Sequence, residues 1–397
     1  MKKIAILGFG VVGQGVASLL SDNFNEVSRL AGSEVEIKYI LDLRDFPDSP
    51  FCDLVVHDFD VIENDSEVSL VCELMGGSHP AYEYTVRALK SGKSVVTSNK
   101  EVVANYGDEF LALARENGVS YRFEASCGGG IPLIETLKSS LMQNKITEIR
   151  GILNGTTNYI LTKMFSFGES FDSALRDAQE KGYAERNPDA DILGFDAVRK
   201  IAILTALVTG KLYDINNIHT EGITKIRSED VKLAEGLGMK IKLLGRCIID
   251  EGEAMIMVAP FMVGSTSPIM NVSGVYNAVE ICSSPLDNVM LYGRGAGAGP
   301  TASAVVADIA SAFRLGKLDT PPYFEKVFAP ADFSEFTTKR YVAFDKTHES
   351  EVRAVFEGSL YLDSDECALI TPKESEGELE EKLARLSFKP NSVIRLL

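Results

Sequence analysis

The sequence predicts an α/β protein in which a doubly wound, Rossmann-type parallel sheet is joined to further α+β parts. Three observations lead to this prediction. A strand runs directly into a glycine-rich turn and a helix at the N-terminus, apolar strands and helices then alternate up to about residue 130, and the 397 residues exceed the size of an ordinary single domain. Ligands of such sheets bind beyond the carboxyl ends of the strands.

Composition and charge exclude several classes of protein. Hydrophobic residues make up 45% and charged residues 24% of the chain, as in soluble globular proteins, and the formal net charge is -17. An acidic chain is a poor partner for nucleic acid or for an anionic membrane surface, because their phosphates attract a basic face. The sequence has no signal segment, no apolar run of membrane-spanning length and no CxxC spacing among its six cysteines. We therefore expect a cytoplasmic protein with reduced thiols and no zinc site.

The first motif lies between an expected strand at residues 3–7 and the helix that follows. It consists of Gly8, Phe9, Gly10, Val11, Val12 and Gly13. Glycine at three of these positions allows a tight turn, a close approach of backbone N–H groups to a pyrophosphate, and close packing of helix on strand. Because a strand precedes it and a helix follows it, the motif predicts a dinucleotide-binding site.

The end of the second expected strand, residues 36–41, bears on the choice of cofactor. An acidic residue at this point binds a ribose 2'-hydroxyl and favours NAD, whereas an arginine pairs with the 2'-phosphate of NADP. The chain offers both, as Asp42 and Arg44, and Asp42 lies further from Gly13 than the roughly 20 residues that are typical. The prediction is NADP or NAD, with a slight preference for NADP through Arg44.

Two further strand ends carry candidate cofactor residues. The apolar residues 69–74 lead into Met75 and Gly76, and the strand at residues 94–97 leads into Ser98 and Lys100, with a helix at residues 80–90 between them. Because the carboxyl ends of parallel strands meet at one edge, we expect both turns at the ligand-binding cleft. A helix at residues 108–117 and a strand at residues 120–125 complete this part.

A bend with three successive glycines follows, from Glu124 to Pro132. Glycines free the backbone to point carbonyl oxygens inward, and with one carboxylate such oxygens can hold a hard cation. A flexible connection between domains explains the same residues equally well. Cys127 within the bend is a candidate nucleophile, although no histidine is paired with it in the sequence.

Two later segments carry polar side chains next to apolar structure. A strand from Ile146 ends in Asn154 to Asn158, which form either a capped helix start or a loop that lines a substrate pocket. The stretch from Glu185 to Lys200 then places seven ionisable residues before a helix that is apolar on nearly every side. Such a helix is buried, so its polar first turns border a cleft, and Asp196 and Lys200 share one face of it. An ordinary surface ion pair is the alternative.

Taken in order, these motifs resemble the homoserine dehydrogenase family, and a glycine-rich segment at residues 293–305 resembles that family's return to its cofactor domain. The resemblance covers roughly residues 1–320. It implies the reversible, NAD(P)H-dependent reduction of L-aspartate 4-semialdehyde to L-homoserine, on the route to threonine, methionine and isoleucine. It also implies a sodium ion, a homodimer or homotetramer, and three domains. These are a cofactor domain at residues 1–130, completed by about residues 300–318, a substrate and dimerisation domain at residues 131–299, and a small ACT-like module at residues 335–397.

The resemblance assigns roles to individual residues. Lys200 is the expected proton donor to the substrate carbonyl, Lys100 lies near nicotinamide and substrate, and Asp196 joins them as a catalytic residue. The substrate-binding residues are Glu185, Asp191, Asp196, Gly155 and Thr156. The cation ligands are Glu124 and the main-chain carbonyls of Cys127, Gly129 and Ile131, and Gly297 joins the cofactor residues. Two lysines among three carboxylates also suit the chemistry, since hydride addition to an aldehyde leaves an alkoxide that takes a proton.

Two other functions and one regulatory question stay open at this stage. A different NAD(P)-dependent oxidoreductase acting on an amino-acid aldehyde would use Cys127 as nucleophile, and a non-catalytic amino-acid sensor would bind the dinucleotide without turnover. The C-terminal elements expected at residues 339–344, 349–356, 368–371, 376–386 and 392–396 make a short βαββαβ-type unit. Its first loop, at residues 345–348, lacks a glycine-containing effector turn, so the sequence leaves threonine regulation open.

Overall fold

The computed structural model describes residues 1–363 and 366–397, and the chain divides into two compact units. Unit 1 comprises Met1–Lys145, Ala202–Ile215 and Leu291–Phe328. Unit 2 comprises Ile146–Ile201, Asn216–Met290 and Ala329–Leu397. The chain passes between the units several times, so neither unit is one continuous segment of the sequence.

Unit 1 is built on the predicted parallel sheet. Its six strands lie in the order β3-β2-β1-β4-β5-β6, and every neighbouring pair is parallel. The strands are β1 (Lys2–Leu7), β2 (Val35–Leu41), β3 (Val55–Val56), β4 (Val68–Glu73), β5 (Ser94–Thr97) and β6 (Tyr121–Arg122). The chain order changes direction between β1 and β4, which is where a doubly wound sheet opens a ligand crevice.

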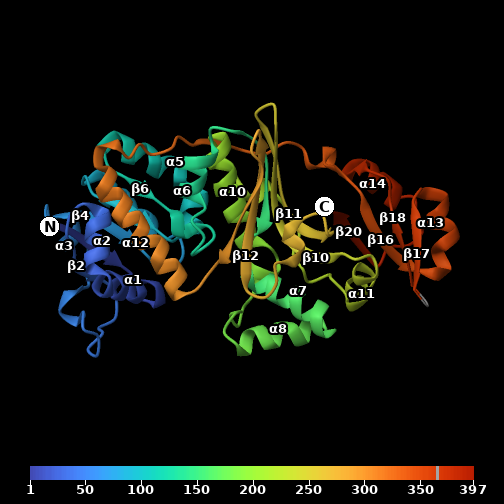
Figure 1. The fold of residues 1–397 in the computed structure, drawn as a ribbon, viewed down its shortest axis with the longest axis horizontal. Coiled ribbons are helices and arrows are strands. Elements are labelled where there is room, and N and C mark those ends of the chain that lie inside the picture. Colours follow the sequence, from blue (N-terminus) through green and yellow to red (C-terminus); the bar gives the residue numbers. More distant parts are fainter. Residues whose placement is uncertain (364–365) are drawn as a thin grey trace. The chain divides into compact units, whose positions relative to one another are not determined.

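The helices of unit 1 fall into two packed groups. One group consists of α1 (Val11–Asp22), α2 (Phe24–Ala31) and α12 (Ala298–Leu315), and the other of α4 (Ala81–Lys90) and α5 (Lys100–Asn117), as Figure 1 shows. Val16, Val305 and Ile309 share a buried cluster with the strand residues Ile4 and Ile6. The smaller elements are α3 (Phe59–Glu63), α6 (Ile134–Thr136), β8 (Lys211–Tyr213) and β14 (Glu325–Val327).

Two predicted boundaries were wrong. The helix expected at residues 108–117 begins at Lys100, because the side chain of Asn99 accepts hydrogen bonds from the N–H groups of Glu101 and Val102 and caps it. The strand expected at residues 120–125 is limited to β6, because a 3-10 turn begins at Glu124. Lys100 is therefore the first residue of a helix rather than part of a loop.

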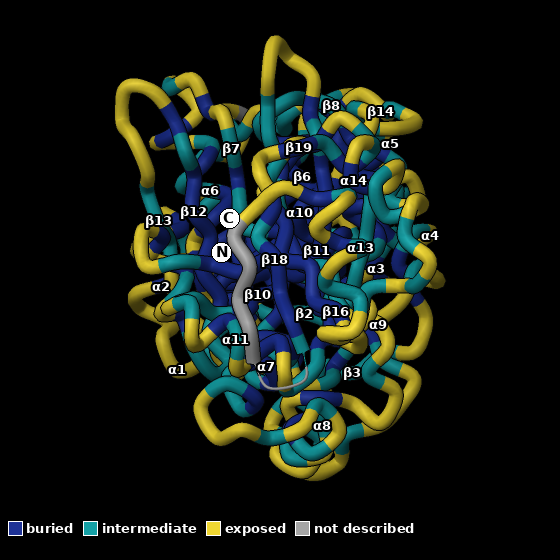
Figure 2. The backbone as a smooth tube through the Cα atoms, turned by 90° about the vertical axis from the view of Figure 1, so that its right-hand side faces the viewer, coloured by how far each residue is buried: buried dark blue, intermediate teal, exposed yellow. Residues whose placement is uncertain are grey.

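Unit 2 contains a mixed sheet in the order β13-β12-β7-β10-β11-β20-β16-β18-β17, with β9 paired to β11. Its strands up to residue 294 are β7 (Lys145–Ile152), β9 (His219–Thr220), β10 (Lys240–Asp250), β11 (Glu253–Val263), β12 (Tyr276–Ser284) and β13 (Asp287–Arg294). The long antiparallel pair β10 and β11 is buried over most of its length (Figure 2).

Five helices accompany this sheet: α7 (Gly155–Phe167), α8 (Phe171–Glu180), α9 (Asp189–Ile192), α10 (Phe195–Thr209) and α11 (Ser228–Gly236). The prediction that the apolar helix after Lys200 is buried is confirmed, since Ile201, Ala202, Ile203 and Leu204 have no exposed surface. Its polar first turns lie in unit 2, whereas the residues from Ala202 onward belong to unit 1.

The C-terminal part of unit 2 has the element order βαββαβ. Its elements are β16 (Arg340–Asp345), α13 (Glu349–Val355), β17 (Ser359–Asp363), β18 (Glu366–Ile370), α14 (Glu376–Leu383) and β20 (Ser392–Leu396), with the short strands β15 (Thr337–Thr338) and β19 (Glu374–Ser375) beside them. The strand β17 was missing from the sequence prediction. β20 pairs with β11, so these elements, hereafter the C-terminal module, continue the sheet of unit 2.

Candidate functional site

The glycine-rich turn after β1 has the geometry of a phosphate-binding loop. Gly8 has φ +90°, which favours glycine, and a Cβ on Gly13 would lie 2.2 Å from the carbonyl oxygen of Gly8. A Cβ on Gly10 would meet no heavy atom within 4 Å. Gly8 and Gly13 thus serve the turn and the packing of α1, while Gly10 leaves the helix N-terminus open to an anion. Val11 beside it is 72% exposed, and Val12 is half-buried.

The end of β2 bonds directly to this loop. Asp42 Oδ2 accepts a hydrogen bond from the N–H of Phe9 (2.8 Å), and Arg44 Nε donates to Asp42 Oδ1 (3.0 Å). The hydrogen bond from Arg44 outweighs burial and lowers the pKa of Asp42 to about 2. His57 Nδ1 donates to the Asp42 carbonyl oxygen (2.7 Å), and this bond raises the pKa of His57. One acidic and two basic side chains, those of Asp42, Arg44 and His57, thus lie together beside the glycine-rich turn.

The turns after β4 and β5 are joined by a buried carboxylate. Glu73 Oε1 accepts from the N–H of Met75 (2.9 Å), and Glu73 Oε2 accepts from the hydroxyl of Thr97 (2.6 Å). Asn99 Nδ2 also donates to the carbonyl of Gly77 (2.8 Å). Glu73 has no exposed surface, and burial raises its pKa to about 7. The two turns are therefore joined to each other, as predicted for neighbouring strand ends, and Ser98 and Lys100 are half-buried beside them.

These residues fit a nicotinamide dinucleotide. A cavity of about 480 Å³ is lined by Gly8, Gly10, Asp42, Arg44, His57, Met75 and Gly76, among others. The N-terminus of α12 lies close to this region, because a Cβ on Gly15 of α1 would be 3.3 Å from the carbonyl oxygen of Ala298. Gly297 forms the N-cap of α12 with φ +118° and is exposed. The N-terminus of α1 thus borders the cavity, and the first turn of α12 packs on α1 one turn further along.

The bend from Glu124 to Pro132 is folded around the Glu124 side chain. The carboxylate accepts hydrogen bonds from the N–H groups of Leu133 (2.7 Å), Ile134 (2.8 Å) and Glu135 (2.7 Å). Burial and the neighbouring Asp308 raise the pKa of Glu124 to about 7. Gly129 has φ +54°, and a Cβ there would lie 2.4 Å from the carbonyl oxygen of Gly295.

This geometry bears on the two alternatives for the bend and on the predicted cation ligands. Glu124 Oε1 accepts from two N–H groups and Oε2 from one, so a cation would be held by Oε2 together with main-chain carbonyls such as those of Gly129 and Ile131. Among the described residues, no group of three or more His, Cys, Asp and Glu side chains could hold a metal ion. Cys127 has no exposed surface, so its thiol is a poor nucleophile for a substrate.

In unit 2, four polar side chains meet near the end of β7 and the start of α10. Three of them, Asp191, Asp196 and Lys200, are predicted site residues, and the fourth is Asn154. Lys200 Nζ donates to Asp196 Oδ2 (2.7 Å) and to the carbonyl of Leu153 (2.7 Å). Asn154 Nδ2 donates to Asp191 Oδ1 (2.7 Å) and to Asp196 Oδ2 (2.9 Å). The Asp196 and Lys200 side chains are each 9% exposed, which excludes an ordinary surface ion pair.

Asn154 was present in a predicted motif but was not selected as a site residue. Its Oδ1 accepts from the N–H of Thr157 (2.8 Å) and caps α7, while its Nδ2 holds the two aspartates. The local sequence indicates the cap, since an asparagine precedes the helix. The bonds to Asp191 and Asp196 come from packing and leave no local signal.

The remaining predicted substrate residues lie at the start of α7 and after α8. Thr156 Oγ1 donates to the carbonyl of Tyr183 (2.6 Å), and Gln179 Nε2 donates to the carbonyl of Glu185 (3.1 Å). Glu185 is exposed, whereas Gly155 packs so closely that a Cβ there would lie 2.7 Å from the Val275 carbonyl oxygen. Thr156 therefore positions the loop that carries Glu185.

Comparison with known proteins identifies the family. The family model "Homoserine dehydrogenase" matches residues 132–310, and the model "Homoserine dehydrogenase, NAD binding domain" matches residues 8–124. The chain belongs to the homoserine dehydrogenase family. It is 41% identical over 320 residues to the homoserine dehydrogenase of Neisseria gonorrhoeae, an alignment that covers 80% of this chain and 73% of that protein.

Solved structures of the family agree with this assignment. The structure of a homoserine dehydrogenase from Thiobacillus denitrificans is 33% identical, with a TM-score of 0.92 over 100% of this chain and 98% of that one. A hyperthermophilic archaeal homoserine dehydrogenase mutant in complex with NADPH is 30% identical, with a TM-score of 0.67 over 79% of this chain and 98% of that one. The enzyme is thus an NAD(P)-dependent oxidoreductase that interconverts L-aspartate 4-semialdehyde and L-homoserine. The different oxidoreductase and the non-catalytic sensor are set aside.

Proposed function

We propose that Lys200 is the proton donor of this homoserine dehydrogenase and that Asp191 and Asp196 bind the substrate. The observation that carries the proposal is the buried Asp196–Lys200 pair, which Asn154 links to Asp191. A lysine held between a carboxylate and the Leu153 carbonyl keeps its ammonium in one place. The carboxylates suit the ammonium group of the amino-acid substrate, and Glu185 with the N-terminal turn of α7 at Gly155 and Thr156 completes the proposed subsite.

In the reduction, the nicotinamide supplies a hydride to the aldehyde carbon of L-aspartate 4-semialdehyde. The carbonyl oxygen then becomes an alkoxide, and Lys200 Nζ donates a proton to it, which yields L-homoserine. In the reverse direction, the same nitrogen as neutral amine removes the hydroxyl proton. Lys100, at the N-terminus of α5, is proposed to stabilise the oxygen from the cofactor side.

The experiment follows NADPH oxidation with L-aspartate 4-semialdehyde in the wild type and in Lys200→Ala. Loss of a general acid lowers the rate by roughly 10²- to 10⁴-fold. Lys181→Ala is the matched control, because Lys181 also forms an i,i+4 ion pair with an aspartate, Asp177, but its side chain is 47% exposed. Turnover that survives Lys200→Ala and collapses in Lys100→Ala would move the proton donor to Lys100.

We further propose that the enzyme accepts both cofactors and prefers NADPH. Arg44 and His57 stand beside Asp42 at the ribose position, and both can pair with a 2'-phosphate, whereas Asp42 can accept from a 2'-hydroxyl. Arg44→Ala is expected to raise the KM for NADPH about tenfold and to leave the KM for NADH nearly unchanged. An equal rise in the KM for NADPH and in the KM for NADH would contradict the proposed preference for NADPH.

A sodium ion is proposed at the bend of unit 1, held by the main-chain carbonyls of Cys127, Gly129 and Ile131. Glu124 folds the bend through three N–H groups and is proposed to complete the site through Oε2, which accepts only one of them. A raised thermal midpoint in sodium chloride over choline chloride at equal ionic strength supports the ion. Equal thermal midpoints in the two salts would contradict a bound sodium ion.

We propose a cytoplasmic homodimer or homotetramer. β13 is an edge strand of the sheet in unit 2, and the neighbouring Leu286 and Tyr292 are 46% and 53% exposed, as expected of a surface that pairs with a second copy. Light scattering on the purified enzyme gives the mass. No helix of the described residues has the length and apolar character needed to cross a membrane.

A further inference from the structure

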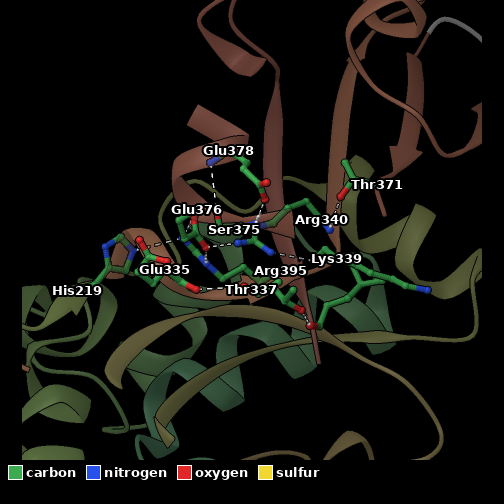
Figure 3. Close-up of polar contacts among 12 residues, drawn as sticks. His219, Glu335, Thr337, Lys339, Arg340, Thr371, Ser375, Glu376, Glu378 and Arg395 are labelled. Carbon is green, nitrogen blue, oxygen red and sulfur yellow. Dashed lines mark hydrogen bonds and ion pairs between the residues drawn. The ribbon is translucent and has the colours of Figure 1, made fainter. Parts of the chain in front are cut away.

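An ion-pair network ties the C-terminal module to strand β9 within unit 2. Arg395 on β20 donates from Nε to Glu376 Oε1 (2.6 Å) and forms an ion pair through Nη2 with Glu221 Oε1 (2.8 Å). Glu376, the first residue of α14, also pairs with Arg340 on β16. Figure 3 shows Arg340, Glu376 and Arg395 pointing toward one another, with His219 on the far side of Glu376.

The network is mostly buried, so its charges depend on one another. The Arg395 and Glu376 side chains are each 7% exposed. Burial raises the pKa of Glu221, but the hydrogen bond from His219 and the charge of Arg395 outweigh it and lower that pKa to about 2. Glu221 is therefore ionised at neutral pH, and although its own side chain is 38% exposed, its removal would leave the buried Arg395 guanidinium with one counter-charge fewer.

The backbone around Glu221 packs directly on the segment that separates Asp191 from Asp196. The N–H of Ile223 donates to the carbonyl of Ile192 (2.8 Å), and a Cβ on Gly222 would lie only 2.0 Å from that carbonyl oxygen. From the other side, a Cβ on Gly194 would meet Thr220 Cγ2 at 3.1 Å. Because these contacts leave no space, residues 220–223 cannot shift without moving residues 192–194.

The same segment and the same network border one cavity. It has a volume of about 590 Å³, and its walls include Leu193, Phe195, Glu221, Glu376 and Arg395. Leu193 and Phe195 lie between the two substrate-site aspartates in the sequence. Arg395, from the last strand of the chain, thus lines the same cavity as two residues of the segment between Asp191 and Asp196.

We propose that Arg395 is a positioning residue for the substrate site. Through Glu221 it holds residues 219–223 against Ile192 and Gly194, and so it fixes the separation of Asp191 and Asp196. This proposal rests on the substrate-binding roles proposed for these two aspartates. It gives the C-terminal module, which lies beyond the family match at residues 132–310, a part in the reaction.

The test compares Glu221→Gln, Arg395→Gln, Arg395→Lys and the double variant Glu221→Gln/Arg395→Gln in steady-state kinetics. Each single glutamine variant should raise the KM for L-homoserine about fivefold, while the KM for NADP+ stays at the wild-type value, because unit 1 binds the cofactor. The double variant should be no worse than Arg395→Gln, since the Glu221–Arg395 pair is already lost in each single variant. Arg395→Lys should recover part of the loss.

Arg353→Gln is the matched control, because Arg353 pairs with Glu349 on the exposed face of α13 in the same module. It should show wild-type KM values. Glu221→Gln keeps the Arg395–Glu376 pair, so it decides the matter even where Arg395→Gln fails to fold.

A wild-type KM for L-homoserine in Glu221→Gln overturns the proposal, as does an equal rise in the KM for both substrates. Full activity in the variants Asp191→Ala and Asp196→Ala would instead refute the proposed substrate site.

Discussion

Asn154 connects the fold to the proposed substrate site. Its oxygen caps α7 and its nitrogen holds Asp191 and Asp196, so the two functions can be separated by substitution. Aspartate keeps a cap oxygen but lacks the N–H donor and adds a third carboxylate.

Asn154→Asp is therefore expected to lower kcat/KM for L-homoserine by roughly 10- to 100-fold, since hydrogen bonds to charged groups contribute about 1.5–3 kcal/mol. The thermal midpoint should change little, because α7 stays capped. Steady-state kinetics and a thermal scan check both parts. Asn154→Ala removes both functions and should lower activity and midpoint together. A fully active Asn154→Asp enzyme would show that the aspartates need no bridge.

Glu73 makes a pH-dependent contribution to stability. Its pKa is raised from 4.5 to about 7 by burial. The contribution of such a group to the free energy of unfolding is fully present below its pKa in the unfolded chain. It is lost as the pH rises through its pKa in the folded protein. Between pH 4.5 and pH 8, the free energy of unfolding of the wild type should therefore fall by about 3 kcal/mol at most relative to that of Glu73→Gln.

Thermal unfolding of both proteins across this range measures the difference. A difference that is constant with pH would contradict an ionisable, buried Glu73. Glu101→Gln is a useful control, because Glu101 is half-buried in the neighbouring helix.

At the scale of elements, the first helix of the dinucleotide site depends on glycine in two distinct ways. A Cβ on Gly10 meets nothing within 4 Å, whereas a Cβ on Gly13 would lie 2.2 Å from a backbone oxygen. Gly10→Ala is expected to fold with a wild-type thermal midpoint but to bind NADPH at least tenfold more weakly, because the methyl group occupies the pyrophosphate approach.

Gly13→Ala should instead lower the thermal midpoint of unfolding, because its methyl group would force α1 away from the turn at Gly8. Fluorescence titration with NADPH and thermal scans distinguish the two. Wild-type NADPH affinity in Gly10→Ala would place the pyrophosphate elsewhere.

For the whole molecule, the C-terminal module completes the sheet of unit 2. β20 pairs with β11 at Phe261 and Met262, both of which have no exposed surface. A chain that ends after residue 391 lacks β20 and exposes this edge, and unpaired apolar edges associate with one another. We expect such a chain to aggregate, as seen by light scattering. A monodisperse, fully active truncated chain would show that the module is dispensable.

The sequence by itself determined features that depend on neighbours along the chain. The parallel sheet, the glycine-rich turn, the buried helix after Lys200 and the Asp196–Lys200 pair all follow from periodicity and from the sterics of glycine, which act over a few residues. The family resemblance rested on the same local motifs.

Only the tertiary structure decided which distant residues meet. Asn154 contacts Asp191 and Asp196 across 37 and 42 residues, and Arg395 contacts His219 across 176. The start of α5 at Lys100 was a local signal that the prediction missed, because Asn99 caps the helix through residues two and three positions further on. The short β6 and the role of Glu124 in folding the bend instead depended on hydrogen bonds that no periodic pattern encodes. The physical reason is that such polar pairings are selected by packing and desolvation in the folded chain, and these depend on every element around them.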